Sequence, residues 1–155
     1  MLQKVMDKIY SVVEAVCMVL VSLMVLVVAW IVFGRYVLNK TPAWGEELSL
    51  MIMVWIGLLS AALGLREDSH LRLTIIDFFT PKKFVSFLKV FVVVLIAGFS
   101  VLFFWQGIEI TKIGMLNTMP GLGIKAAWFY LSAPVAGVLM LLFALERLIR
   151  NKHDS

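Results

Sequence analysis

The stretch AVCMVLVSLMVLVVAWIVF, residues 15–33, contains no charged side chain. The hydrocarbon core of a bilayer is about 30 Å thick, and an α-helix needs roughly 20 residues to cross it. A run of this length and composition therefore predicts a membrane-spanning helix. Three further apolar stretches, centred on residues 48–65, 90–105 and 126–145, are long enough, or nearly so, to do the same.

The composition of the whole chain agrees with an integral membrane protein. Of the 155 residues, 62% are hydrophobic and only 15% are charged, which is too little polar surface for a water-soluble domain. The spans must be helical, because open strands would leave backbone amides unpaired in lipid, and no segment alternates long enough for a β-barrel. We predict an all-α integral membrane protein in which residues 1–155 form one domain. Its four transmembrane helices are expected at about 9–38, 43–65, 81–110 and 124–148.

The first span has a competing interpretation as a secretory signal, because Lys4 and Lys8 precede it. The apolar stretch is too long for a typical signal core, and no small-residue cleavage pattern follows it. We therefore predict that the span is retained.

The lysines and arginines indicate how the spans are oriented. Ten of the 14 lie before the first span, between the second and third, or after the fourth, and cytoplasmic segments carry such an excess. Both termini are therefore predicted to be cytoplasmic. The same distribution accounts for the net charge of +4, so a nucleic-acid partner is not needed to explain it.

The segment at about 69–79 is too short to cross the membrane and too apolar for a free loop. As a helix it has Leu71 and Ile75 on one face and His70 on the other, which predicts an amphipathic segment lying in the cytoplasmic interface. Membrane lipids would be its partner there. Apolar residues alternate at positions 71, 73 and 75, which leaves a strand open as an alternative.

The second helix is expected to begin at Thr41 and Pro42, which suit an N-cap and a first helical turn. Trp44 then lies at the depth where indole rings favour the lipid headgroups. In the fourth span, Pro134 is expected to kink or loosen the helix.

Two carboxylates, Glu46 and Glu47, lie near the start of the second helix, where the helix dipole favours negative charge. One interpretation has them solvated and satisfied by water and by Arg35 or Lys40. The other has Glu46, with or without Glu47, paired with a basic group in a neighbouring helix or subunit. Both roles are structural.

A ridge of small residues follows on the second helix. At 100° per residue, Glu46, Gly57 and Gly64 lie within about 20° of one another, and Ser60 and Ala61 flank them. In lipid, small residues let another helix approach closely. The ridge is therefore predicted to face a neighbouring helix.

The search for chemistry is mostly negative. His70 and His153 are far apart and outside the spans, so no haem or His/Cys metal site is indicated, and Cys17 is expected to act as a small apolar residue. The GLGIK stretch, residues 121–125, lacks the spacing of a phosphate-binding loop and indicates a turn into the fourth helix. Glu109 and Lys112 are expected to form a local pair. We predict that this chain is not an enzyme and binds no cofactor or metal.

Transport remains the natural broad class, but four spans with scarcely any buried polar groups make a poor autonomous carrier. These features favour an accessory subunit packed against a larger membrane protein. The alternative is a small homodimeric exporter coupled to protons through Glu14, because acids within spans often mark ion paths.

Several stretches resemble the small membrane subunit of tripartite ATP-independent periplasmic (TRAP) transporters. These are GRYVLN at residues 34–39, TPAWGEELSLMIMVWIGLLSAALGLREDSHLRL at residues 41–73 and AAWFYLSAPVAGVLM at residues 126–140. The positions that match the family pattern are Arg35, Asn39, Trp44, Glu46, Glu47, Trp55, Gly57, Ala61, Gly64, Arg66, His70 and Pro134. We take most of these, together with Ser60, as candidates for subunit contact or orientation.

The resemblance implies a complex of three components. A periplasmic binding protein captures the solute, a large membrane subunit carries it, and the small subunit acts as a scaffold in the bacterial inner membrane. Uptake in the family is typically driven by a sodium gradient, and the cargo is an organic acid such as a C4-dicarboxylate or a sialic acid. The sodium and substrate sites would belong to the large subunit.

Overall fold

Among the residues that the structure describes, four helical stretches are long and apolar enough to cross a membrane: Gln3–Tyr36, Ala43–Glu67, Phe91–Leu116 and Ala127–Arg147. The structure is a computed structural model that describes residues 2–40, 42–76 and 82–153, and the side chains of residues 2, 68–76, 82–90 and 148–153 lie outside that description. Within the described part there is no β-strand, only an isolated bridge between Thr118 and Lys125. The predicted all-α fold with four spans is confirmed.

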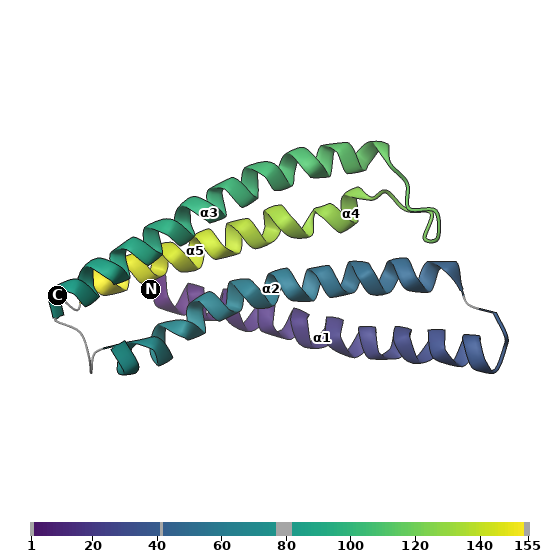
Figure 1. The fold of residues 1–155 in the computed structure, drawn as a ribbon, viewed down its shortest axis with the longest axis horizontal. Helices are drawn as coiled ribbons and strands as arrows, with labels where there is room; N and C mark the ends of the chain where they lie inside the picture. The colour runs from purple at the N-terminus through teal and green to yellow at the C-terminus, as the bar shows by residue number, and fades with distance from the viewer. Residues whose placement is uncertain (1, 41, 77–81, 154–155) are drawn as a thin grey trace.

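The helices are α1 (Leu2–Tyr36), α2 (Ala43–Ile76), α3 (Lys82–Leu116), α4 (Ala127–Tyr130) and α5 (Ser132–His153). They form a row in which α2 packs between α1 and α5, and α3 packs on α4 and α5 (Figure 1). Both termini lie at one end of the bundle, and the connections α1–α2 and α3–α4 lie at the other. This agrees with termini on one side of a membrane, and their cytoplasmic location stays a prediction.

The buried core lies where α1, α2 and α5 meet. It contains Val13 and Cys17 of α1, Leu59, Ala62 and Leu63 of α2, and Met140 and Phe143 of α5. Cys17 is a free, buried thiol among apolar side chains, as predicted. The opposite face of α1 carries large exposed apolar residues, which suits contact with lipid or with another membrane protein.

Glycines let α3 approach the last span closely. A Cβ added at Gly107 would lie 2.7 Å from Cδ of Pro134, and one added at Gly137 would lie 2.9 Å from the backbone nitrogen of Phe104. The ridge predicted on α2 behaves differently, because a Cβ at Gly57 or Gly64 would meet no described atom within 4 Å. Glycines of α3 and α5 therefore make a close helix contact within this chain, whereas the glycines of the α2 ridge do not.

The second helix is longer than predicted. It was expected to end near residue 65, before a separate segment at 69–79, but α2 continues without a break through Ile76. No glycine or proline occurs between Gly64 and Pro81, so nothing in this part of the sequence ends the ladder of backbone hydrogen bonds. Residues 77–79 and the predicted cap residue Thr41 lie outside the described residues.

The fourth span consists of α4 and α5, and Leu131 joins them with helical backbone angles of φ −60° and ψ −22°. The N–H of Leu131 donates to the carbonyl of Ala127 at 2.8 Å, as in a regular helix. Proline has no N–H to donate to the carbonyl of Tyr130. The kink or loosening expected from Pro134 stays a prediction. The hydroxyl of Ser132 donates to the carbonyl of Phe129 at 2.8 Å.

Adding one methyl group to α3 tests the close contact. Gly107→Ala should destabilise the protein by about 1–3 kcal/mol, because the new Cβ overlaps Pro134. Gly98→Ala, on the same helix, should be neutral or slightly stabilising, because nothing described lies within 4 Å and alanine favours the helix. Thermal unfolding in detergent, followed by tryptophan fluorescence, measures both. Equal shifts in midpoint would contradict the contact.

Candidate functional site

A cluster of polar side chains joins three helices at the end of the bundle that holds the termini. We call Asp7, Tyr10, Arg66, Glu67 and Glu146 the Arg66 cluster. Arg66 of α2 donates two hydrogen bonds to Glu146 of α5, from Nε to Oε2 and from Nη2 to Oε1, each 3.1 Å long. Its Nη2 also donates to Oδ1 of Asp7 on α1. One guanidinium therefore connects α1, α2 and α5.

The two ion pairs of Arg66 differ in burial, and hence in energetic weight. The side chains of Arg66 and Glu146 are 18% and 11% exposed, whereas Asp7 is 68% exposed. Water and salt screen an exposed pair, which contributes about 0–1 kcal/mol. Breaking a buried, bidentate pair is far more costly because the remaining charge stays in a poorly hydrated place. The pair with Glu146 is therefore expected to stabilise the bundle more than the pair with Asp7.

Aromatic rings hold the guanidinium of Arg66 in place. Its Cζ lies 5.1 Å from the ring centre of Tyr10 and 5.8 Å from that of Phe143. A flat, delocalised cation is attracted to the face of such a ring, and a lysine could not make the same planar contacts. The hydroxyl of Tyr10 donates to Oε1 of Glu67, so the ring is itself fixed.

The sequence singled out Arg66 but not its partners. Glu146 is an acid in the last turns of the fourth span, at the end predicted to be cytoplasmic. Arg66 lies in the last turn of the second span, at the same end. Opposite charges at the same depth of two spans were an available signal, but only the fold reveals that α2 and α5 are neighbours. His70, the other candidate in this region, belongs to α2, and its side chain lies outside the described residues.

At the opposite end, Glu47 holds the loop that connects α3 with α4. Its Oε2 accepts hydrogen bonds from the backbone N–H groups of Gly121, at 3.0 Å, and Leu122, at 2.9 Å. A Cβ at Gly121 would lie 2.6 Å from the carbonyl oxygen of Ala43, so only glycine allows this approach. Glu47 was expected to be solvated or paired with a base, and instead it binds backbone amides.

The loop held by Glu47 has an ordered backbone of its own. The N–H of Met119 donates to the carbonyl of Ile124 at 2.8 Å, and that of Ala126 donates to Asn117 at 3.0 Å. Gly123 has a φ of +67°, which glycine adopts without strain. The predicted turn at residues 121–125 is confirmed as the tip of this hairpin.

Asn39 shapes the turn after α1. Its φ is +54°, in the left-handed region that asparagine tolerates better than most residues. The N–H of Lys40 donates to the carbonyl of Gly34 at 3.1 Å, which folds the turn back onto the last turn of α1. Arg35 is exposed in the last turn of α1, where a cation favours the helix dipole.

The two tryptophans of α2 have different surroundings. Trp44 is 36% exposed at the start of the helix, the depth predicted for an anchor in the headgroup region. Trp55 is half-buried, and its Nε1 donates to the backbone carbonyl of Trp128 in α4 at 3.1 Å. This bond ties α2 to the short helix at the start of the fourth span.

The predicted ridge on α2 faces away from the described chain. Gly57, Ser60 and Ala61 are exposed, and Gly64 is half-exposed. Glu46 is also exposed and has no hydrogen-bond or ion-pair partner among the described residues. The structure therefore leaves a strip of small side chains open along one helix, free for contact with another protein or with lipid.

The described part of the chain offers little with which to hold a solute. Its buried polar side chains, Ser100, Thr111 and Ser132, each donate to a carbonyl three or four residues earlier in the same span. No group of three His, Cys, Asp or Glu residues that could hold a metal occurs there. Glu14 is exposed on α1 and does not face the bundle interior. The arrangement is suited to packing and tethering.

Comparison with known proteins adds a family to this geometry. A family model described as "Tripartite ATP-independent periplasmic transporters, DctQ component" matches residues 24–152. The chain is 28% identical over 152 residues to the sialic acid TRAP transporter small permease protein SiaQ of Vibrio cholerae, covering 96% of this chain and 84% of that protein. It is 26% identical over 139 residues to a putative TRAP transporter small permease protein of Haemophilus influenzae, covering 88% and 84%.

A third relative is much longer than this chain. The sialic acid TRAP transporter permease protein SiaT of Haemophilus influenzae is 26% identical over 110 residues. These residues are 71% of this chain but only 18% of SiaT. A segment similar to this chain therefore forms a small part of a larger permease polypeptide in that relative.

Replacing Arg66 tests the cluster at the termini. Arg66→Met should lower stability by about 1.5–3 kcal/mol, because the part-buried carboxylate of Glu146 loses two charge-assisted hydrogen bonds. Arg66→Met combined with Glu146→Leu should recover part of the loss, because no uncompensated charge then remains. Glu109→Gln, which breaks the exposed pair with Lys112, should cost at most about 1 kcal/mol. Equal losses in the single variants, measured by thermal unfolding, would rule out a special role for Arg66.

Replacing Glu47 tests the hold on the loop. Glu47→Ala should speed hydrogen exchange at the amides of Gly121 and Leu122 by about tenfold or more, because a bond to a charged acceptor contributes about 1.5–3 kcal/mol. Glu46→Ala is the matched control and should leave those amides unchanged. Exchange followed by mass spectrometry measures both variants, and the same protection in both would contradict the tether.

Proposed function

This chain belongs to the DctQ component family of tripartite ATP-independent periplasmic (TRAP) transporters, and we propose that it is the scaffold on which the large membrane subunit of such a transporter is mounted. The small permease subunit itself carries no solute in this proposal. It enlarges the immobile part of the complex, against which the solute-carrying part of the large subunit moves.

The observation that carries the proposal is the contrast between the interior and the surface of the bundle. Among the described residues, the interior polar side chains form hydrogen bonds within their own helices or belong to the Arg66 cluster. The ridge on α2, by contrast, is open. A carrier needs polar groups at the middle of the membrane, whereas a scaffold needs a rigid body and an exposed face.

The partner is proposed to be a large TRAP permease subunit on a separate polypeptide. The relative SiaT supports this, because a segment similar to this chain makes up only 18% of that permease polypeptide and is joined there to the rest of it. Two segments that are fused in one polypeptide of a relative commonly form two subunits of the same complex when they are separate chains. The open ridge on α2 offers small residues where a helix of the large subunit can approach closely.

The cargo is proposed to be an organic acid, with sialic acids ahead of C4-dicarboxylates. Two of the relatives are named for sialic acid, which supports this order. Uptake would be driven by a sodium gradient, and a periplasmic binding protein would deliver the solute. The solute and sodium sites would lie on the large subunit, so this chain needs no cofactor of its own.

The location is proposed to be the inner membrane of a bacterium, with both termini in the cytoplasm. The excess of lysine and arginine near the termini supports this orientation. The Arg66 cluster would then face the cytoplasm, and the loop held by Glu47 would face the periplasm. The binding protein would meet the complex on the side of this loop.

Reconstitution in liposomes tests the proposal. With the large subunit, the binding protein and an inward sodium gradient, we expect uptake of sialic acid that is lost when this chain is omitted. The chain alone should move nothing, and Glu14→Gln should leave uptake by the full complex unchanged. Transport by the chain alone that is lost in Glu14→Gln would establish the proton-coupled exporter instead.

Copurification tests the face that meets the large subunit. Gly64→Leu should reduce recovery of the large subunit severalfold, because a bulky side chain on the ridge keeps a second helix away. Gly98→Leu, at an exposed glycine of α3, is the matched control. Glu46→Ala should weaken association or uptake without preventing membrane insertion. Normal recovery with all three variants would remove the α2 ridge from the interface.

A further inference from the structure

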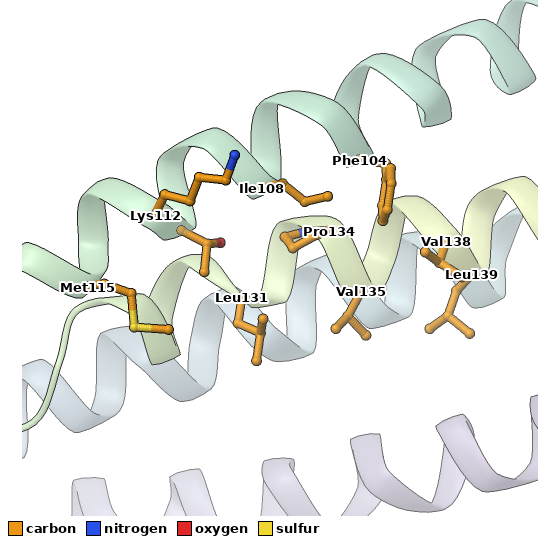
Figure 2. Close-up of a pocket in the computed structure, with 10 residues that line it drawn as sticks. Phe104, Ile108, Lys112, Met115, Leu131, Pro134, Val135, Val138 and Leu139 are labelled. Atoms are coloured by element: carbon orange, nitrogen blue, oxygen red, sulfur yellow. The ribbon is translucent and has the colours of Figure 1, made fainter.

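A groove of about 440 Å³ lies between α3 and the last span, near the end that carries the loop at residues 117–126 (Figure 2). Its walls are apolar side chains, with Phe104 and Ile108 on α3 facing Pro134 and Val138 on α5. Lys112 is the one charged residue that lines it. Two of the lining residues, Phe104 and Pro134, are also those that the glycines of the facing helix approach closely.

The depth of the groove in a membrane follows from the charges on α3. Residues 90–108 carry no charge, and at 1.5 Å per residue they cover about 28 Å, close to the thickness of the hydrocarbon core. Glu109 and Lys112 therefore mark the boundary with the headgroups. Trp128, 59% exposed, lies near the same level, because α4 packs on α3 beside Gly114. Exposed indole rings favour that level.

The groove crosses the boundary between hydrocarbon and headgroups. At 1.5 Å per residue, Phe104 lies about 7.5 Å on the hydrocarbon side of Glu109, and Met115 lies about 9 Å beyond it. Lys112 lies between Glu109 and Met115, so it places a cation at the depth where a lipid phosphate can contact it.

The lining of the groove suits a hydrocarbon chain. Apart from Thr111 and Lys112, the side chains that line it are apolar, and an extended acyl chain can lie along such a trough. A side chain from a helix of a protein partner is the competing occupant, and copurification of the large subunit distinguishes the two.

We propose that this groove is a binding site for one phospholipid, whose acyl chain lies between α3 and α5 and whose phosphate contacts Lys112. The ammonium group of Lys112 has three donors, and the exposed contact with Glu109, 3.5 Å long, uses one of them. The hydroxyl of Thr111 donates to the carbonyl of Gly107 at 2.6 Å, so the wall remains apolar where the chain lies. This site does not depend on the proposed scaffold function.

A second groove, of about 400 Å³, differs from the first in having no charged side chain in its lining. It lies between α2, α3 and α5, and its lining includes Ala61, Phe99 and Met140. No charged side chain lines it, so it offers nothing to a headgroup. Of these two grooves, the one with Lys112 combines an apolar trough with a cation at headgroup depth.

Native mass spectrometry of the full chain, purified in mild detergent from bacterial membranes, tests the proposal. We expect one phospholipid to remain bound to the wild type. Val138→Phe fills the groove and should reduce the lipid-bound fraction at least about fivefold, whereas Val101→Phe, at an exposed position of α3 outside both grooves, should not. Absence of bound lipid from the wild type, or equal retention in the two variants, would overturn the site.

The headgroup contact has its own test with the same measurement. Lys112→Gln should lower retention of added phosphatidylglycerol and phosphatidylethanolamine severalfold, because both present a phosphate. Lys125→Gln, at an exposed cation of the neighbouring loop, should lower neither. Unchanged retention in Lys112→Gln overturns the assigned phosphate contact. If Val138→Phe reduces copurification of the large subunit but not lipid binding, the groove belongs to a protein partner, and the lipid site is wrong.

Discussion

The structure depends on one constraint of the bilayer, which is that apolar side chains gain almost nothing by leaving lipid for the interior of a bundle. Helices must therefore be held together by close backbone approach and by polar contacts. This chain uses the first along the middle of α3 and α5, where glycines meet Pro134 and Phe104. It uses the second at the ends, through Arg66 on one side and Glu47 on the other.

The central position of α2 lets its polar contacts connect the other helices at both ends of the bundle. It is the helix that packs between α1 and α5, and both polar tethers start from it. Arg66 fixes one end of α2 to α1 and α5, Trp55 bonds to α4 in between, and Glu47 grips the loop at the far end. A helix fastened at three heights cannot easily tilt relative to the last span. The same helix carries the open ridge, so its exposed face is held by the rest of the bundle.

Hydropathy and capping predicted the four spans and the start of α2, because these are properties of one stretch of sequence in lipid. The end of α2 was not predictable in this way, since the amphipathic pattern after residue 65 fits a continued helix as well as a separate one. Side-chain partners were also out of reach. Arg66 and Glu146 are 80 positions apart, and Glu47 binds amides 74 and 75 positions away. Such pairs follow from which helices are neighbours, and a single sequence does not state that.

The two adjacent carboxylates at the start of α2 illustrate how a short motif can divide its tasks. Neighbouring residues on a helix point about 100° apart, so one of the pair can face the bundle while the other faces away. Glu47 points inward and satisfies two backbone amides of the loop, whereas Glu46 is exposed on the side of the small-residue ridge. The loop and Glu46 are consequently parts of one rigid surface at this end of the molecule. A partner that binds the loop therefore meets a surface fixed to α2, and a force on it passes to the whole bundle rather than to a free segment of chain.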